Sequence, residues 1–230
     1  YLAKEINFDD SNKKLLEDLI HYGLTLGADF VEIFLENTDN ISVLVEEDFI
    51  TSVSPSFGKG AGIRIFKDKR DGFVSTNDLS RDGLTKAISQ AVQMLDITET
   101  SSYSTFQGLE DLRNYSKRKN DWLKNVPLVD EIGEKLLLST ISLKKDPKVN
   151  IRKSSYARNW QQVLIASSDG TFAKDIRLHQ TVGLNLIATD RQYRSSGSRR
   201  FGSSDNPNDL RNWDHENASN EVLESSMNML

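Results

Sequence analysis

The chain has 230 residues, enough for one large domain or two smaller ones around a sizeable core. Its 29 basic and 34 acidic residues leave a formal net charge of -5, so nucleic acid is not expected as the main ligand. The sequence has no cysteine, which excludes disulfides and thiolate metal ligands within it, and no apolar run long enough to cross a bilayer. We therefore expect a cytoplasmic protein without a membrane partner.

The first hundred residues predict a helix, a run of antiparallel strands and a second helix. Residues 9–27 start with capping residues and continue with leucines at helical spacing. Alternating apolar residues then predict three strands, over 30–36, 41–47 and 49–54, with a turn at 37–40. Ser80 suits the N-cap of a helix over 81–96, which carries one continuous apolar stripe. This order predicts an N-terminal α+β domain over residues 1–100.

The stretch "GKGAGIRIFKDKRDGFVSTND", residues 58–78, contains a cluster of glycines. A dinucleotide-binding fingerprint needs G-x-G-x-x-G between a strand and a helix, but here the spacing is G-x-G-x-G and a strand follows. The pattern instead predicts a β-hairpin with a close-packed entry at Gly58 and Gly60 and with "KDKRDG" as its turn. Arg64 is the polar side chain of this hairpin that we select for mutation.

The second half predicts a strand-rich domain. Residues 101–127 show little periodicity and are interpreted as a linker, followed by a helix over 127–145. A Ser-Asp-Gly turn signal at 168–170, clean alternation from Ile176 onward and a returning strand over 192–202 predict antiparallel strands, and a last helix covers 217–230. The expected fold is α+β, with antiparallel sheets each packed against helices, in two sub-domains. The second sub-domain covers residues 128–230.

Spacing and composition alone show no active site. The three histidines form no paired motif, and no G-x-S-x-G elbow occurs. Arg191, Arg194, Arg199 and Arg200 gather around Tyr193, where a solvated β-ribbon that contacts a partner subunit is favoured over a nucleic-acid strip.

The order of several local patterns resembles the TldD/PmbA family, metallopeptidases also described as modulators of DNA gyrase. "ADFVEIFLE", "GAGIRIF" and "GFVSTNDLSRDGLTKAISQA" resemble the first domain of that family. "SSDGTFAKDIRL" resembles a segment in which a glycine precedes Asp-x-Arg, here Gly170, Asp175 and Arg177. "RSSGSRRFG", "LRNW" and "EVLESSMNML" resemble the run that leads to the metal-binding helix of the family.

The resemblance implies a zinc metallopeptidase that acts on unfolded peptides as a homo- or heterodimer with a family paralogue, with gyrase as a further partner. In the family, an H-E-x-x-x-H helix and a downstream cysteine hold the zinc. This sequence contains neither, so no catalytic residue or metal ligand is assigned in it, and zinc is expected in a C-terminal part beyond residue 230. Arg64, Asp175 and Arg177 are candidates for a peptide cleft or an interface. The alternative is a non-catalytic interaction module, either a degenerate PmbA-type subunit or a gyrase modulator.

Overall fold

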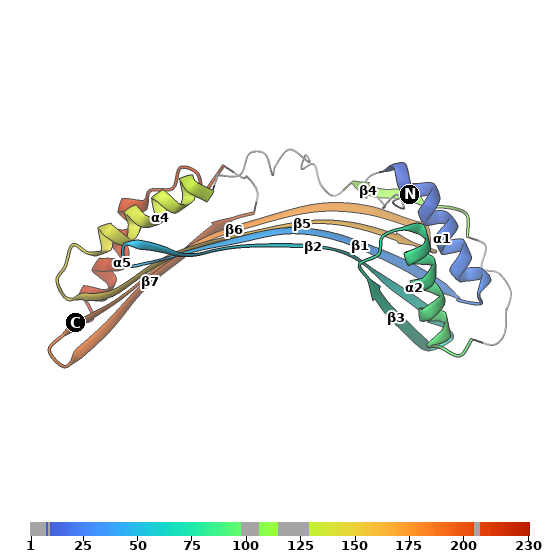
Figure 1. The fold of residues 1–230 in the computed structure, drawn as a ribbon, viewed down its shortest axis with the longest axis horizontal. Coiled ribbons are helices and arrows are strands. Elements are labelled where there is room, and N and C mark those ends of the chain that lie inside the picture. The colour runs from blue at the N-terminus through green and yellow to red at the C-terminus, as the bar shows by residue number, and fades with distance from the viewer. Residues whose placement is uncertain (1–7, 9, 98–105, 115–128, 205–207) are drawn as a thin grey trace. The chain divides into compact units, whose positions relative to one another are not determined.

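The computed structural model describes residue 8 and residues 10–97, 106–114, 129–204 and 208–230 (Figure 1). No helix within these ranges is long and apolar enough to span a membrane. In chain order, the elements are η1 (Asp10–Asn12), α1 (Lys13–Thr25), β1 (Phe30–Glu46), β2 (Phe49–Lys67), β3 (Arg70–Thr76), α2 (Arg81–Gln93), β4 (Glu110–Asn114), α4 (Val129–Leu143), β5 (Val149–Ser167), β6 (Thr171–Asp190), β7 (Tyr193–Ser203) and α5 (His215–Met227).

The described strands form one seven-stranded sheet in the order β3-β2-β1-β5-β6-β4, with β7 paired to β6. Two hydrogen bonds show that β1 and β5 run antiparallel. At the start of β1 the Val31 amide donates to Ser168 Oγ, just after the end of β5. At the other end of β1 the Glu47 amide donates to the Arg152 carbonyl, near the start of β5. β4 adds a parallel strand beside β6. The predicted α+β class is confirmed, but the strands share a single sheet where the sequence indicated separate sheets.

The strands are longer than the sequence suggested. The turn predicted at 37–40 lies inside β1, and the glycine cluster from residue 58 lies inside β2. Asp39 and Asn40 remain extended because β5 supplies partners for them: Arg158 Nη2 lies 2.5 Å from Asp39 Oδ1, and Asn159 Nδ2 donates to Asn40 Oδ1 at 2.6 Å. Cross-strand hydrogen bonds therefore replace the local turn that these residue types usually favour.

The chain folds as two compact units, and the first comprises Tyr1–Thr38, Gly58–Lys117 and Gln161–Ile176. α1 and α2 cover one face of its strands (Figure 1). α2 begins at Ser80, whose Oγ accepts from the Gly83 amide at 3.1 Å, as the capping prediction requires. The core contains Leu16, Leu19, Ile20, Ile33, Leu35, Ile63, Ile65, Leu84, Ile88 and Phe172, all at most 2% exposed.

The predicted hairpin is confirmed, with β2 antiparallel to β3 from Ala61↔Thr76 to Lys67↔Arg70. Its turn is shorter than predicted and consists of Asp68, whose φ is 54°, and Lys69. Asp29 accepts from the Asp68 amide at 2.8 Å and from Lys67 Nζ at 2.9 Å. The amide hydrogen bond, followed by that of Lys67, lowers the pKa of the Asp29 carboxyl below its ordinary value.

The second unit comprises Asp39–Phe57, Arg118–Trp160 and Arg177–Leu230. α4 and α5 pack together on one face of its strands (Figure 1), over a core that includes Val45, Leu136, Tyr156, Leu184 and Val222. Buried hydroxyls lie between these layers: Ser154 Oγ donates to the Leu136 carbonyl, and Ser195 and Ser226 hydrogen-bond to each other. Small hydroxyl side chains thus permit close packing while their own polar groups remain satisfied.

The predicted linker, residues 101–127, contains β4, and the rest of it lies largely outside the described residues. The division into domains at 1–100 and 128–230 stays a prediction.

Candidate functional site

A groove of about 360 Å³ lies in the first unit, on the sheet face opposite α1 and α2. Alternation places it there: Ile33 and Ile63 point into the helix-covered core, so their neighbours Phe34 and Gly62 face the other way. The groove is lined by Phe34, Glu36, Gly58, Lys59, Gly60, Ala61, Gly62, Phe73, Ser75, Thr76 and Asn77.

The glycine cluster forms the floor of this groove. A Cβ on Gly62 would lie 3.0 Å from the Phe73 ring, and one on Gly60 would lie 3.1 Å from Asn77 Oδ1. A Cβ on Gly58 would lie 2.7 Å from Thr38 Oγ1. Neighbouring side chains therefore lie over the backbone of β2 at its glycines: Thr38 over Gly58, Asn77 over Gly60 and Phe73 over Gly62. The cluster provides space for neighbouring side chains, and a phosphate-binding turn is absent from this hairpin.

Arg64 lies beside the groove and does not line it. Its Nε is 3.8 Å from Asp71 Oδ2, and its guanidinium lies 5.4 Å from the centre of the Phe66 ring. The side chain is half exposed. Arg64 thus has two partners within its own hairpin, and its role towards a ligand stays a prediction.

The structure does not bring the three residues chosen from the sequence to one site. Asp175 lies on β6 of the first unit, and β1 and β5 separate β6 from the β2 strand that carries Arg64. At strand spacings of about 4.8 Å, this places the two backbones about 14 Å apart at least. Arg177 follows two positions later on β6, within the second unit, and is exposed.

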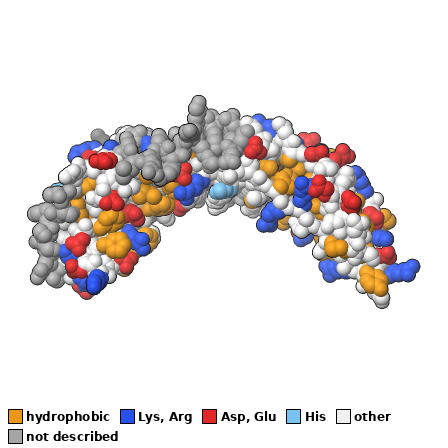
Figure 2. Space-filling model, turned by 180° about the vertical axis from the view of Figure 1, so that it is seen from behind, with side chains coloured by type: hydrophobic (Ala, Val, Ile, Leu, Met, Phe, Trp, Pro, Cys, Tyr) orange, Lys and Arg blue, Asp and Glu red, His pale blue; other side chains and the backbone are white. Residues whose placement is uncertain are grey.

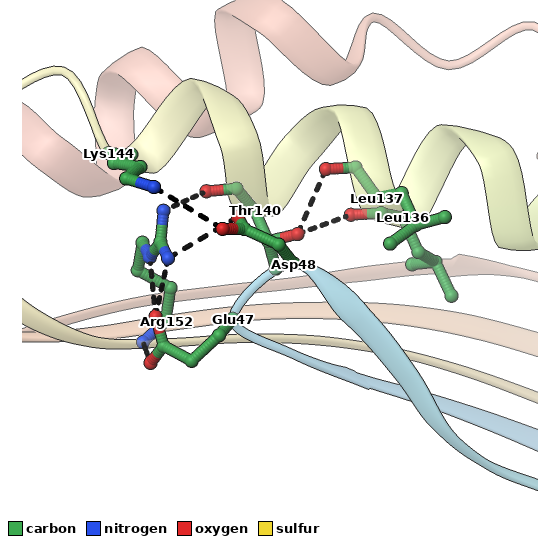
Figure 3. Close-up of polar contacts among 7 residues, drawn as sticks. All are labelled: Glu47, Asp48, Leu136, Leu137, Thr140, Lys144 and Arg152. Atoms are coloured by element: carbon green, nitrogen blue, oxygen red, sulfur yellow. Dashed lines mark hydrogen bonds and ion pairs between the residues drawn. The ribbon is translucent and has the colours of Figure 1, made fainter.

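A polar network around Arg152 was not anticipated from the sequence. Arg152 is 5% exposed and starts from β5, while Glu47 and Asp48 form the turn between β1 and β2 (Figure 3). The Arg152 guanidinium donates to Glu47 Oε2 from Nε at 2.9 Å and from Nη2 at 2.5 Å, and Nη2 lies 3.4 Å from Asp48 Oδ1. Asp48 also pairs with Lys144 at 3.3 Å.

This network has a structural role. Arg152 Nη1 donates to the Thr140 carbonyl in the last turn of α4, where the helix carries unpaired carbonyls and partial negative charge (Figure 3). The same arginine holds Glu47 in a left-handed conformation with φ of 55°. Arg152 therefore links β5 to the β1–β2 turn and to α4. Each charged side chain of the network, Arg152, Glu47, Asp48 and Lys144, has a partner of opposite charge.

The described residues do not fit a zinc site. Among them, no group of three or more histidine, aspartate or glutamate side chains lies close enough to hold a metal ion. His21, His179 and His215 belong to three different elements, α1, β6 and α5.

Tyr156 is a buried titratable side chain of the second unit. Its hydroxyl donates to Gln180 Oε1 at 2.8 Å. Burial raises the pKa of this phenol to about 12, so it stays neutral.

The protein is of the α+β class and is built on one sheet of long strands. Solved structures of other proteins have a similar fold. A protein described as a proposed modulator of DNA gyrase from Bacteroides thetaiotaomicron is 20% identical, with a TM-score of 0.72 over 96% of this chain and 50% of its own. TldE from Thermococcus kodakarensis is 19% identical, with a TM-score of 0.71 over 93% of this chain and 47% of its own. At these identities, the likeness establishes the fold alone.

The chain belongs to the PmbA/TldA metallopeptidase family, also called TldD/PmbA. The family model for domain 1 matches residues 31–95, and the model for the central domain matches residues 127–230. Over 200 residues the chain is 22% identical to a "Metalloprotease TldD homolog" of Buchnera aphidicola, which covers 83% of this chain and 39% of the relative. The chain therefore spans about two fifths of the length of that relative.

Proposed function

We propose that this chain is the N-terminal, substrate-shaping and dimer-forming part of a TldD-like zinc metallopeptidase that acts on unfolded peptides in the cytoplasm. The consecutive match to the first and central domains of the metallopeptidase family supports this proposal. The zinc and its ligands would belong to a part of the protein beyond this chain. Residues 1–100 and 128–230 would act as two sub-domains joined by 101–127.

An edge of the sheet in the second unit suits an extended peptide. β3 pairs only with Ala61–Lys67 of β2, so residues 49–57 have no outer neighbour among the described strands. Phe49, Val53 and Phe57 recur on one side of this segment and are 72%, 47% and 73% exposed. An added strand would bond to the backbone of the segment regardless of sequence, while these side chains would favour apolar peptides.

The groove of the first unit offers a second contact. Its glycine floor and the rings of Phe34 and Phe73 leave room for about one peptide side chain, given the volume of about 360 Å³. Arg64 and Asp175 of this unit, and Arg177 of the second, are proposed to contact peptide or a partner subunit. The dimer would form with a second copy or with a paralogue.

The test uses the full-length product of the gene that encodes this chain. We expect zinc-dependent hydrolysis of an unfolded protein, lost on chelation and restored by zinc. Val53→Lys should raise KM severalfold without a change in kcat, because it places a charge on the apolar edge. Leu138→Lys, which alters a similarly exposed residue of α4, is the matched control. Absence of hydrolysis at every zinc concentration would refute the proposal.

The alternative is a non-catalytic interaction module, either a degenerate PmbA-type subunit or a gyrase modulator. Its support is the fold, shared with TldE and with a proposed gyrase modulator at TM-scores of 0.71 and 0.72. This alternative predicts that the full-length protein changes the supercoiling activity of gyrase, or restores peptidase activity to a paralogue, while it hydrolyses nothing alone.

A further inference from the structure

One face of β6 and β7 in the second unit carries polar and basic side chains. The core-facing row of β6 includes Val182, Leu184 and Leu186, so the alternate positions point away from α4 and α5. The register of the β6–β7 ladder extends this outer row onto β7. The outer row consists of Arg177, His179, Thr181, Gly183, Asn185, Ile187 and Thr189 on β6, and of Arg194, Ser196, Ser198, Arg200 and Gly202 on β7.

Within the second unit this outer row contains no carboxylate; Asp175, two positions before Arg177 in the same row of β6, belongs to the first unit. Arg194 and Arg200 are exposed, and four of the other ten positions carry a hydroxyl group: Thr181, Thr189, Ser196 and Ser198. On β5, Lys153 faces Glu46 of β1, and those two charges pair with each other. Although the whole chain is acidic and its surface mixes both charges (Figure 2), this face is therefore positive.

Gly183 marks the centre of the face. Its position is buried, and a Cβ built there would lie 2.9 Å from Ser155 Oγ, 4.0 Å from Arg200 Nε and 4.0 Å from Asn185 Nδ2. A hydroxyl, a guanidinium and an amide from three neighbouring strands thus converge around one point. All three groups can donate hydrogen bonds, and a residue larger than glycine at position 183 would press against Ser155 Oγ. We define Ser155, Gly183, Asn185 and Arg200 as the donor cluster.

We propose that the donor cluster binds the carboxylate of an aspartate or glutamate side chain in an extended peptide that lies along the outer row. This inference rests on the proposed peptide-binding function and adds a preference for acidic sequence. A carboxylate accepts from Arg200 by a charge-assisted bond and from the hydroxyl and amide by neutral ones. Arg194 and Arg200 supply the complementary charge on either side of Asn185 and its partner Ser198.

The test measures binding of two fluorescent, unstructured peptides to this chain by fluorescence anisotropy. The peptides differ only in that one has glutamate where the other has glutamine. We expect the glutamate peptide to bind about tenfold more tightly, as one charge-assisted hydrogen bond would give. Arg200→Gln should abolish this difference. Arg191→Gln, which removes an equal charge from the turn of the same hairpin, should preserve it.

Three binding outcomes, and one in the peptidase assay, would overturn the proposal. Equal binding of both peptides would remove the acidic preference, and equal loss in the two arginine variants would reduce the effect to net charge. Tighter binding of oligothymidine than of the glutamate peptide, falling steeply with salt, would assign the face to nucleic acid instead. The proposed peptidase is tested separately: zinc-dependent hydrolysis of both peptides at equal rates would refute the acidic site alone.

Discussion

The ion pair between Arg152 and Glu47 should contribute measurably to the stability of the second unit. The two side-chain hydrogen bonds join a guanidinium that is 6% exposed to a carboxylate that is 43% exposed. A hydrogen bond to a buried charged group stabilises by about 1.5–3 kcal/mol, and an exposed ion pair by about 0.2–1 kcal/mol. Because only one partner is buried, we expect an intermediate coupling of about 2 kcal/mol between the two residues.

A double-mutant cycle measures this coupling. Glu47→Ala, Arg152→Met and the double variant are unfolded in urea, and the free energies of unfolding are compared. Glu47→Gln serves as the control, because it keeps an acceptor for the Arg152 amide and removes only the charge. In 1 M salt the coupling should persist largely, because the arginine is buried. A coupling below about 0.5 kcal/mol would refute the view that this network fastens the turn to α4.

Three further predictions concern stability. Burial raises the Tyr156 pKa to about 12, so the stability gained by keeping this phenol neutral is complete below pH 10 and is lost as the pH rises from 10 towards 12. Urea titrations should show a loss of roughly 3 kcal/mol over this range, and Tyr156→Phe should remove this pH dependence. Gly72→Ala should lower the free energy of unfolding by about 2 kcal/mol, because its Cβ would lie 2.6 Å from the Ala91 carbonyl oxygen, whereas Gly133→Ala meets only a flexible side-chain end and should change it little. The pKa of Asp29 is lower in the folded protein than its ordinary value of 3.8, so this carboxylate stabilises the fold above pH 3.8 and the stabilisation is lost as the pH falls through the pKa of the folded state. Asp29→Asn should therefore make Tm fall less steeply as the pH is lowered.

The sequence was most informative where structure is local. The helices α1, α2 and α4, the Ser80 cap and the hairpin after the glycine cluster follow from spacing and capping within about twenty residues. Family membership also came from the order of short patterns, as the matches to residues 31–95 and 127–230 show.

The sequence was least informative where a residue depends on a distant partner. Asp39 and Asn40 indicated a turn because their partners lie 119 positions away on β5. The sequence predicts no strand over residues 149–160, the first part of β5, because Arg152 and Ser154 occupy buried positions there and interrupt the apolar alternation. The donor cluster could not be predicted for the same reason, because only the arrangement of three strands places Ser155 and Arg200 near Gly183.

The position of β1 between β2 and β5 also affects folding during synthesis, because β2 is made directly after β1 and β5 much later. On one side β1 pairs with β2, which follows it directly in the chain. On the other side it pairs with β5, and the bonded residues Val31 and Ser168 are 137 positions apart in the sequence. β1, β2 and β3 can assemble with α2 while the ribosome still holds the second half. Until β5 emerges, however, one edge of β1 has no strand beside it and remains open to pairing with other nascent chains. Such a protein should depend on chaperones for as long as translation lasts, and slowing elongation between β3 and β5 should increase aggregation.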